Sequence, residues 1–323
     1  MQGLEQTIKK RAEELLNGGE VVRVIGWKEG DFSYDISPAT FTKESVKDFA
    51  YTPFCGANLS KYLIEESKKD GKTAVFLKPC DTYSFNQLVK EHRIVRENVY
   101  VVGIECDGKI DADKVRANGI DSILSAKDDG ENVIISTLDG DKSVKREDVL
   151  LEKCLACKGK KHMVYDELIG EEKDDAPRPR FALVEELEKM TEEERFAFWK
   201  KELSKCIRCN ACRNVCPACS CVNCVFDNPK SNIASKSNAD SFEEKLYHII
   251  RAWHVAGRCT DCGECSRVCP QGIPLHLINR KFIKDMNAFY GDYQAGVDIE
   301  LNAPLNSYKV SDREPKDFDG KEQ

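Results

Sequence analysis

The sequence predicts two domains, an α/β N-terminal domain followed by an α-helical dicluster bacterial-ferredoxin-like domain. The first is indicated by short β-branched segments that alternate with amphipathic helical segments. The second is indicated by the spacing C-x2-C-x2-C-x3-C-P, which occurs twice and is the ligand spacing of two-cluster ferredoxins. We expect the α/β domain at 1–170, a linker at 171–190, the dicluster domain at 191–290 and an extended tail at 291–323.

The composition describes a globular chain that binds metal. Its 323 residues are 41% hydrophobic and 33% charged, which allows two domains with their own cores. The chain starts with a charged amphipathic segment instead of a signal peptide, and no apolar run approaches membrane-spanning length. The net charge of −7 gives no nucleic-acid footprint. Sixteen cysteines in such a chain indicate metal binding instead of disulfides. From these observations together we expect a cytoplasmic protein that neither inserts into a membrane nor binds nucleic acid.

The α/β domain is expected to begin with a helix over 4–17, which has one apolar face and ends at two glycines. A strand follows over 20–25, with Gly26 as a turn residue. Cys55 lies just before a helix expected over 59–69, where the helix dipole favours the thiolate. The alternative is that Cys55 is a small buried apolar residue.

Two further strands, over 73–78 and 98–104, are separated by a helix over 84–91. Such a unit makes a right-handed crossover between parallel strands. Cys80 follows the first strand and Cys106 the second, so both are expected at the carboxyl edge of one sheet, where ligands collect. Because neighbouring strands lie about 4.8 Å apart, both sulfurs could reach one metal cluster.

A cysteine pair with the spacing C-x2-C follows a hairpin that turns at Asp139 and Gly140. On its own this spacing does not separate a zinc site, a redox dithiol and an iron–sulfur cluster. Together with the edge cysteines it completes a set for a third [4Fe-4S] cluster, with Cys55 as a competing ligand and with zinc or buried thiols as alternatives. The set is Cys80, Cys106, Cys154 and Cys157. The flanking lysines, whose charge would favour the thiolates, are Lys78, Lys153 and Lys158.

The two repeats are expected to hold two [4Fe-4S] clusters with crossed ligands. In a bacterial ferredoxin, three cysteines of a run bind one cube and the fourth binds the other. One predicted set is Cys206, Cys209, Cys212 and Cys269. The other is Cys259, Cys262, Cys265 and Cys216. A pair of zinc knuckles is disfavoured, because zinc sites use two separated C-x2-C pairs and stop at four ligands.

Three more cysteines follow the first repeat and exceed the needs of two clusters. They are Cys219, Cys221 and Cys224. With Cys55 they would complete a ligand set for a fourth cluster, provided that Cys55 approaches from the other domain. The alternative is a structural role for some of the three.

Helices are expected around the repeats. Thr191 and Glu194 form a capping box that opens the helix leading into the first repeat. A helix over 241–255 joins the repeats, and its expected buried face carries Leu246, Ile249, Ile250 and Trp253. His248 and His254 on this helix are expected to be surface or packing residues. The tail is polar and is expected to be disordered or wrapped over a partner.

These motifs resemble the beta-subunit family of deazaflavin-coenzyme hydrogenases and dehydrogenases, which includes formate dehydrogenase beta subunits. The resemblance is carried by Lys78-Pro-Cys-Asp81, Gly103-Ile-Glu-Cys-Asp-Gly108, the Cys154/Cys157 pair and the ferredoxin repeat. The run Cys216-Pro-Ala-Cys-Ser-Cys221 also resembles iron–sulfur subunits of anaerobic sulfite reductases and soluble sulfhydrogenases. In this chain the repeat follows the α/β domain, whereas it precedes that domain in the deazaflavin members.

The resemblance implies an iron–sulfur electron-transfer subunit of an anaerobic oxidoreductase complex, of the formate dehydrogenase, hydrogenase or heterodisulfide-reductase type. Its partners would be catalytic and carrier subunits in a hetero-oligomer, and the chain alone would carry no catalytic residues. The alternative is an FAD-containing beta subunit that itself exchanges electrons with a deazaflavin or nicotinamide carrier. FAD binding stays open, and no flavin-binding residues are assigned, because the chain shows neither G-x-G-x-x-G after a strand nor a P-loop.

Overall fold

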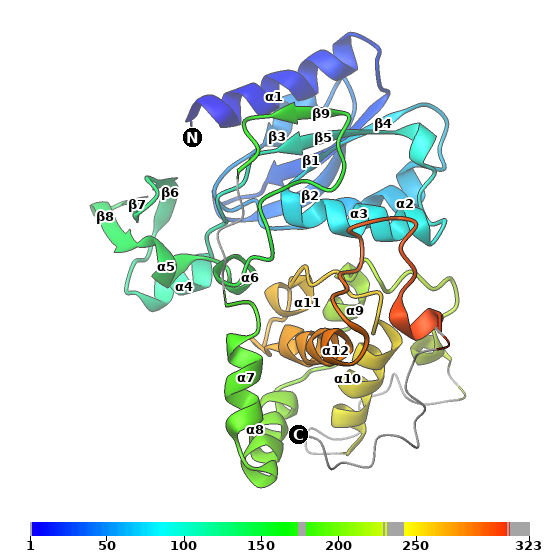
Figure 1. Ribbon diagram of the computed structural model, residues 1–323. Coiled ribbons are helices and arrows are strands. Elements are labelled where there is room, and N and C mark those ends of the chain that lie inside the picture. Colours follow the sequence, from blue (N-terminus) through cyan, green and yellow to red (C-terminus); the bar gives the residue numbers. More distant parts are fainter. Residues whose placement is uncertain (1, 174–178, 229, 231–241, 309, 311–323) are drawn as a thin grey trace.

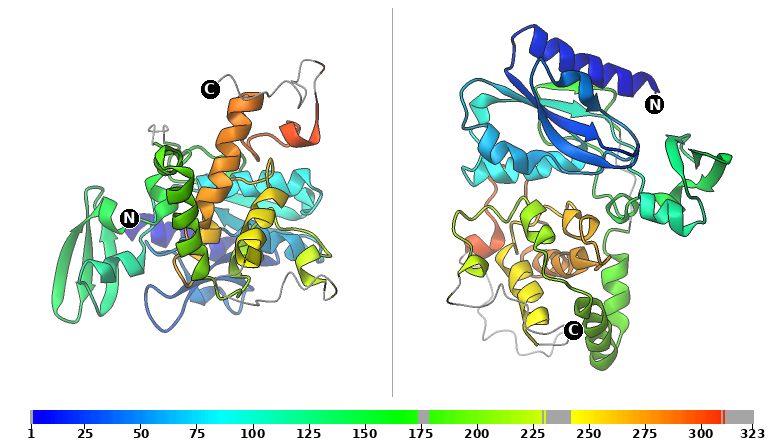
Figure 2. Two further views of the ribbon diagram at one scale, coloured as in Figure 1. Left: turned by 90° about the horizontal axis from the view of Figure 1, so that it is seen from below. Right: turned by 180° about the vertical axis from the view of Figure 1, so that it is seen from behind.

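The computed structural model describes residues 2–173, 179–228, 230, 242–308 and 310. A sheet-containing part and a helical part lie one above the other in Figure 1. A small second sheet stands away from the rest of the chain in both views of Figure 2. Within the described ranges, no helix combines the length and the apolar character that a membrane crossing requires.

The main sheet has the strand order β2-β1-β4-β5-β9, and β3 also pairs with β1. Its strands are β1 (Arg23–Glu29), β2 (Ile36–Phe41), β3 (Phe49–Ala50), β4 (Thr73–Leu77), β5 (Val99–Ile104) and β9 (Glu167–Ile169). The pairs from β1 through β4 and β5 to β9 are parallel, which confirms the predicted crossover, whereas β2 and β3 run antiparallel to β1. Gly26 lies inside β1 instead of at a turn, and the position requires glycine because a Cβ there would clash with the Phe49 ring.

Helices cover both faces of this sheet, as its parallel strands require. α1 (Gln2–Asn17) lies over one face, and its apolar side is buried in the core at Ile8 and Leu15. α2 (Leu63–Glu66) and α3 (Pro79–Lys90) lie over the other face, between the sheet and the helical part (Figure 1). The carboxyl ends of β4 and β5 therefore lead toward the helical part.

Two predicted helices of this part have different bounds. The helix expected over 59–69 is a 3-10 turn (Ser60–Tyr62) followed by the single turn of α2. α3 begins at Pro79 instead of residue 84, because proline has the fixed φ that the first helical position needs. As a result, Cys80 lies in the first turn of a helix and not at the end of a strand.

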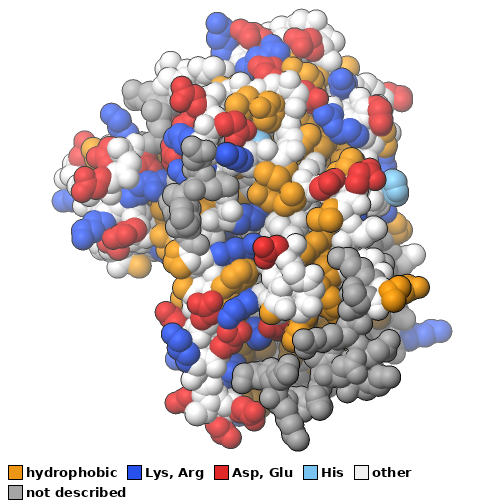
Figure 3. Space-filling view, in the orientation of Figure 1, with side chains coloured by type: hydrophobic (Ala, Val, Ile, Leu, Met, Phe, Trp, Pro, Cys, Tyr) orange, Lys and Arg blue, Asp and Glu red, His pale blue; other side chains and the backbone are white. Residues whose placement is uncertain are grey.

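The small sheet is antiparallel and contains β6 (Ile123–Asp128), β7 (Asn132–Thr137) and β8 (Gly140–Lys145). The pairing of β7 with β8 confirms the hairpin that turns at Asp139 and Gly140. Val133 and Ile135 are buried in one apolar cluster with residues of α4 (Ala112–Ala117) and α5 (Arg146–Val149). Charged side chains of both signs cover this sheet on the face seen in Figure 3, as expected where an antiparallel sheet faces water.

The helical part contains α7 (Ala182–Lys189), α8 (Glu192–Ser204), α9 (Ala211–Val215), α10 (Phe242–His254), α11 (Glu264–Arg267) and α12 (Leu275–Tyr290). The short α6 (Glu152–Leu155) precedes it, and further 3-10 turns are Val46–Asp48, Arg96–Asn98, Val225–Asp227 and Pro304–Asn306. The capping box of Thr191 and Glu194 is confirmed at the start of α8. α7 occupies part of the range expected as a linker, and its Glu188 pairs with Lys281 and Lys284 of α12. α7 thus packs as part of the helical part.

The face that α10 buries is opposite to the predicted one. Tyr247, His248 and Arg251 are buried, whereas Ile249 and Trp253 are 45% and 66% exposed. The interior beside α10 is lined by cysteines. Thiolates and anionic clusters interact better with a guanidinium and an imidazole than with alkyl groups, so the apolar stripe of the helix lies outside.

The first part of the predicted tail packs against both the helical part and the α/β part. The buried Tyr293 donates from its hydroxyl to the carbonyl oxygen of Gly257 at 3.0 Å. Asn86 of α3 donates to the carbonyl oxygen of Gly296 at 3.1 Å, and in Figure 1 the chain rises from α12 to α3. The expectation of disorder is wrong for 291–308, because these contacts hold the segment in place. The end of the tail lies outside the described residues.

Candidate metal centres

The two cysteine repeats form loops with the same backbone pattern. In each loop, residues with positive φ stand on both sides of the second cysteine. They are Arg208 (φ 54°) and Asn210 (φ 61°) in the first repeat, and Asp261 (φ 52°) and Gly263 (φ 68°) in the second. Left-handed residues turn the chain sharply, and a short helix, α9 or α11, then leads to the fourth cysteine. The two loops are therefore built to hold the same kind of group.

The cysteines of the repeats line two cavities of nearly equal size. One cavity of ≈ 340 Å³ is lined by Cys206, Cys209, Cys212 and Cys269. The other, of ≈ 350 Å³, is lined by Cys216, Cys259, Cys262 and Cys265. In each case the fourth cysteine of one repeat faces the first three of the other, which is the crossed grouping that the spacing predicts. We call these cavities the first and the second cavity.

Burial dominates the thiol chemistry of these cavities. It raises the pKa of Cys212 to about 11 and the pKa of Cys265 to about 12. Arg251, which is 2% exposed, lies close enough to both thiols to favour their thiolate forms. The cationic core of a bound metal cluster would supply the remaining stabilisation, since metal ligation deprotonates a thiol outright.

Two polar side chains that the sequence reasoning did not assign lie against cysteine sulfurs. The Nε2 atom of His248 is 3.3 Å from the Sγ atom of Cys206. The Nδ2 atom of Asn279 donates to the Sγ atom of Cys265 at 3.7 Å. Burial lowers the pKa of His248 to about 3, followed by the effects of Arg251 and Arg208, so its ring is neutral at neutral pH. The sequence-based placement of His248 as a packing or surface residue missed this contact.

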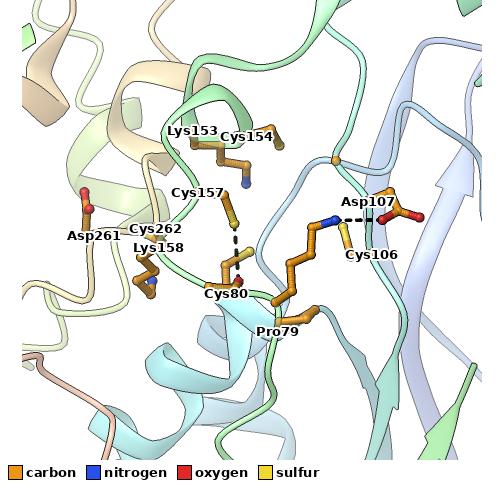
Figure 4. Close-up of a pocket in the computed structure, with 13 residues that line it drawn as sticks. Pro79, Cys80, Cys106, Asp107, Lys153, Cys154, Cys157, Lys158, Asp261 and Cys262 are labelled. Carbon is orange, nitrogen blue, oxygen red and sulfur yellow. Dashed lines mark hydrogen bonds and ion pairs between the residues drawn. The ribbon is translucent and has the colours of Figure 1, made fainter. Parts of the chain in front are cut away.

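A third cavity lies at the boundary between the α/β part and the helical part. It is lined by Cys80, Cys106, Cys154 and Cys157, the predicted set, together with Cys262. Figure 4 shows these side chains around the cavity; Cys80 comes from the start of α3, Cys106 follows β5, and Cys154 lies on α6. Four thiols thus converge from three segments of the α/β part.

Two of the three predicted lysines line this third cavity, namely Lys153 and Lys158. Lys78 is instead buried in an ion pair with Asp81 at 2.7 Å, and its Nζ atom also donates to the Ala57 carbonyl oxygen at 2.8 Å. Burial, followed by the charge of Asp81, holds the pKa of Cys80 well above its ordinary value, while the lysines act in the opposite direction. The lysines alone therefore do not ionise this thiol.

Cys55 is separated from the other cysteines by its packing. Its side chain is fully buried in the apolar core of the α/β part, and it is not among the residues that line the cavities. Burial raises its pKa, although its sulfur accepts a hydrogen bond from the Thr52 backbone at 3.1 Å. The structure thus places Cys55 as a packing residue, and the expected thiolate beside a long helix is wrong because a 3-10 turn and the single turn of α2 follow instead.

The remaining cysteines line a fourth cavity beside α10. These residues are Cys219, Cys221 and Cys224. A hydrogen bond from Cys216 lowers the pKa of Cys219 to about 7. His254 also lines this cavity; it is an exposed residue whose ring contacts that of Phe226, in line with the expected surface or packing role.

Ion pairs fix the second and third cavities against each other. Glu264, beside Cys265, pairs with Lys153, beside Cys154, at 2.5 Å and with Arg267 at 2.8 Å. The buried Asp261 pairs with Arg280 at 2.8 Å, and although burial opposes it, the neighbouring cations lower the pKa of Asp261. The carboxylates that precede and follow Cys262 are thus both held by cations.

The donor sets fit iron–sulfur cubes better than single ions. Among the described residues, no three His, Cys, Asp or Glu side chains come close enough together to hold one metal ion. The cysteines surround larger spaces, with four thiols in each of the first and second cavities and four in the third besides the shared Cys262. Four thiolates around a space of this kind are the ligands of a [4Fe-4S] cluster.

Comparisons with known proteins agree with this chemistry. The 4Fe-4S dicluster domain family matches residues 202–273, which confirms a dicluster domain in the C-terminal half. The chain is 27% identical to the F420-dependent formate dehydrogenase subunit beta of Methanocaldococcus jannaschii, over 90% of this chain and 92% of that protein. It is 26% identical to the F420-dependent formate dehydrogenase 1 subunit beta of Methanococcus maripaludis, over 90% of each.

A solved structure with a partial likeness is that of the F420-reducing [NiFe] hydrogenase complex from Methanosarcina barkeri. The similarity covers 46% of this chain and 58% of that chain, with a TM-score of 0.39 and 16% sequence identity. The predicted resemblance to beta subunits is confirmed by the two formate dehydrogenase relatives, which match this chain over most of its length.

Proposed function

We infer that the chain belongs to the beta-subunit family of deazaflavin-coenzyme hydrogenases and dehydrogenases, and we propose that it is the iron–sulfur electron-transfer subunit of such a complex. Similarity to formate dehydrogenase beta subunits over 90% of the chain supports the family. The dicluster domain supports the cofactor class. Because both relatives are named as subunits, we propose a hetero-oligomer with catalytic and carrier subunits in an anaerobic cytoplasm.

Three [4Fe-4S] clusters are proposed for the first, second and third cavities. Bound clusters of this type exchange single electrons. The protein would hold them through the four cysteines of each cavity and tune the sulfurs through His248 and Asn279. FAD is not assigned to any described residue.

The observation that carries this proposal is the placement of Cys262. It lines both the second and the third cavity, so these two sites share a wall. Cys212 of the first cavity and Cys265 of the second lie in one buried apolar cluster. The third cavity adjoins the second, and cysteines of the second and first pack in one cluster, which supports a relay from the α/β part into the helical part.

The experiment is anaerobic reconstitution followed by stepwise reduction. We expect about twelve iron and twelve sulfide per chain from these three sites, one-electron redox steps, and no turnover of formate or hydrogen until a catalytic subunit is added. Oxidation of a soluble substrate by the chain alone would overturn the proposal. Extraction tests the flavin alternative, because FAD released from the purified chain would favour a subunit that reduces its carrier directly.

A further inference from the structure

The fourth cavity differs from the other three in its ligands and its size. Only three cysteines line it, from a C-x-C-x2-C run in a single loop. Its empty space, which includes a part open to solvent, is ≈ 860 Å³, against ≈ 340, ≈ 350 and ≈ 520 Å³ for the first, second and third cavities. Cys221 is exposed and Cys224 is partly exposed. The site therefore has room for a cube and for something beside it.

The cysteine needed for a fourth thiolate is not within this site. Cys55, which the sequence predicts as the fourth ligand of such a cluster, is buried in the core of the α/β part. The other twelve cysteines line the first three cavities. A cluster held here would consequently have three cysteine ligands, and one of its irons would lack a cysteine.

The charges around this cavity favour an anionic group. Two of its cations have carboxylate partners: Arg258 pairs with Glu91 and Arg213 pairs with Asp227, each at 2.6 Å. Lys61 has no carboxylate partner in its hydrogen bonds; it donates to three backbone carbonyls of the cysteine loop, at 3.0 to 3.4 Å. Lys61 therefore orients the loop and leaves its charge uncompensated.

Arg251 is a further cation of this cavity, and its charge also acts on Cys212 and Cys265 of the first and second cavities. It lines the cavity and is 2% exposed, yet its Nε and Nη1 atoms have no hydrogen-bond partner within the described part of the chain. A buried guanidinium without an anion is costly, because it has lost its water. Three thiolates on an oxidised cube leave one net negative charge, and reduction adds a second. Lys61, together with the share of Arg251 that acts on Cys219, would offset this charge.

We propose that Cys219, Cys221 and Cys224 hold a fourth [4Fe-4S] cluster whose fourth iron is free of cysteine and faces the open part of the cavity. That iron can take a small anion or a thiolate from solution. The cluster would be the most solvent-accessible of the four, at the helical side of the chain. This fourth cluster is separate from the proposed electron relay, because the clusters of the first three cavities do not depend on it.

The test uses the lability of an iron without cysteine. Mild treatment with ferricyanide should convert [4Fe-4S]²⁺ into [3Fe-4S]⁺, releasing Fe²⁺ and giving one electron to the oxidant. The anaerobically reconstituted full chain is treated and examined by EPR spectroscopy. We expect a [3Fe-4S]⁺ signal in the wild type and none in the double variant Cys221→Ser, Cys224→Ser, which should also contain about four fewer irons per chain.

Cys55→Ala is the matched control and should keep both the iron and the signal. Unchanged iron in the double variant, or zinc in place of iron in the wild type, would overturn the fourth site. The double variant should still show reducible clusters in the other cavities. Their absence from the wild type as well would count against the proposed function and not against this site alone.

Discussion

Lys153 and Glu264 form a buried ion pair that joins the two parts of the chain, with 2.5 Å between Nζ and Oε1. Glu264 is 0% exposed and also accepts from the Asn58 backbone at 3.2 Å. Although burial opposes both effects, the partners hold the pKa of Glu264 well below its ordinary value and raise the pKa of Lys153. Both residues stand next to cysteines of neighbouring cavities, so this pair ties the second cavity to the third.

Replacing Glu264 should destabilise the chain strongly. Glu264→Gln leaves Lys153 buried without its counter-charge, which should cost about 3–5 kcal/mol in the free energy of unfolding, measured by denaturant titration. Lowering the pH should also decrease the free energy of unfolding, because it protonates the Glu264 carboxylate. The carboxylate stabilises the fold fully above the ordinary glutamate pKa of about 4.3, and this contribution is lost as the pH falls toward the depressed folded value.

The control is Asp113→Asn, which breaks an exposed pair with Arg116 and should cost less than about 1 kcal/mol. Equal losses in the two variants would show that the Lys153–Glu264 pair has no special role.

The third cavity can be tested by counting iron. The double variant Cys80→Ser, Cys106→Ser should lose about four irons per chain while the signals of the first and second cavities persist. Cys55→Ala should retain all iron, because Cys55 packs in the core. Iron loss in the Cys55 variant and not in the double variant would reverse the assignment.

His248 and Asn279 should tune different clusters. His248→Leu removes the contact at Cys206, and Asn279→Leu removes the donor at Cys265. An N–H group near a cluster sulfur stabilises the reduced, more negative state, so each variant should lower one reduction potential and leave the other unchanged. Each variant is the control for the other in a potentiometric titration followed by EPR. A shift of both potentials by either variant would point to a general structural effect.

Gly263 should tolerate no side chain. Its φ is 68°, and a Cβ would lie 2.6 Å from the Cβ of Lys153. Gly272 has a similar φ of 62° but nothing within 4 Å, so Gly272→Ala isolates the backbone cost of about 1–2 kcal/mol. Gly263→Ala should lower the free energy of unfolding further and weaken the third cluster. Identical losses would mean that the contact with Lys153 is easily relaxed.

The cysteine groups could be predicted from the sequence because they follow from spacing and from strand order. The placement of Cys80 with Cys106 needed only the parallel crossover of β4 and β5. The sharing of Cys262 by two cavities could not be predicted, since it depends on how the two parts pack. The buried face of α10 was predicted wrongly, because periodicity assumes that apolar residues lie inside, whereas this helix turns Arg251 and His248 toward thiols.

The crossed positions of Cys216 and Cys269 have a consequence for assembly. Each lies in the cavity formed by the other repeat, so a cube in either cavity closes the long loop between the repeats. Bringing distant ligands together costs conformational entropy, mainly through loop closure. Binding of the first cube would close the loop, so the second cube would bind without this entropic cost. Loading should therefore be cooperative, and a chain that is short of iron should divide into empty and doubly filled molecules, with few that carry a single cube.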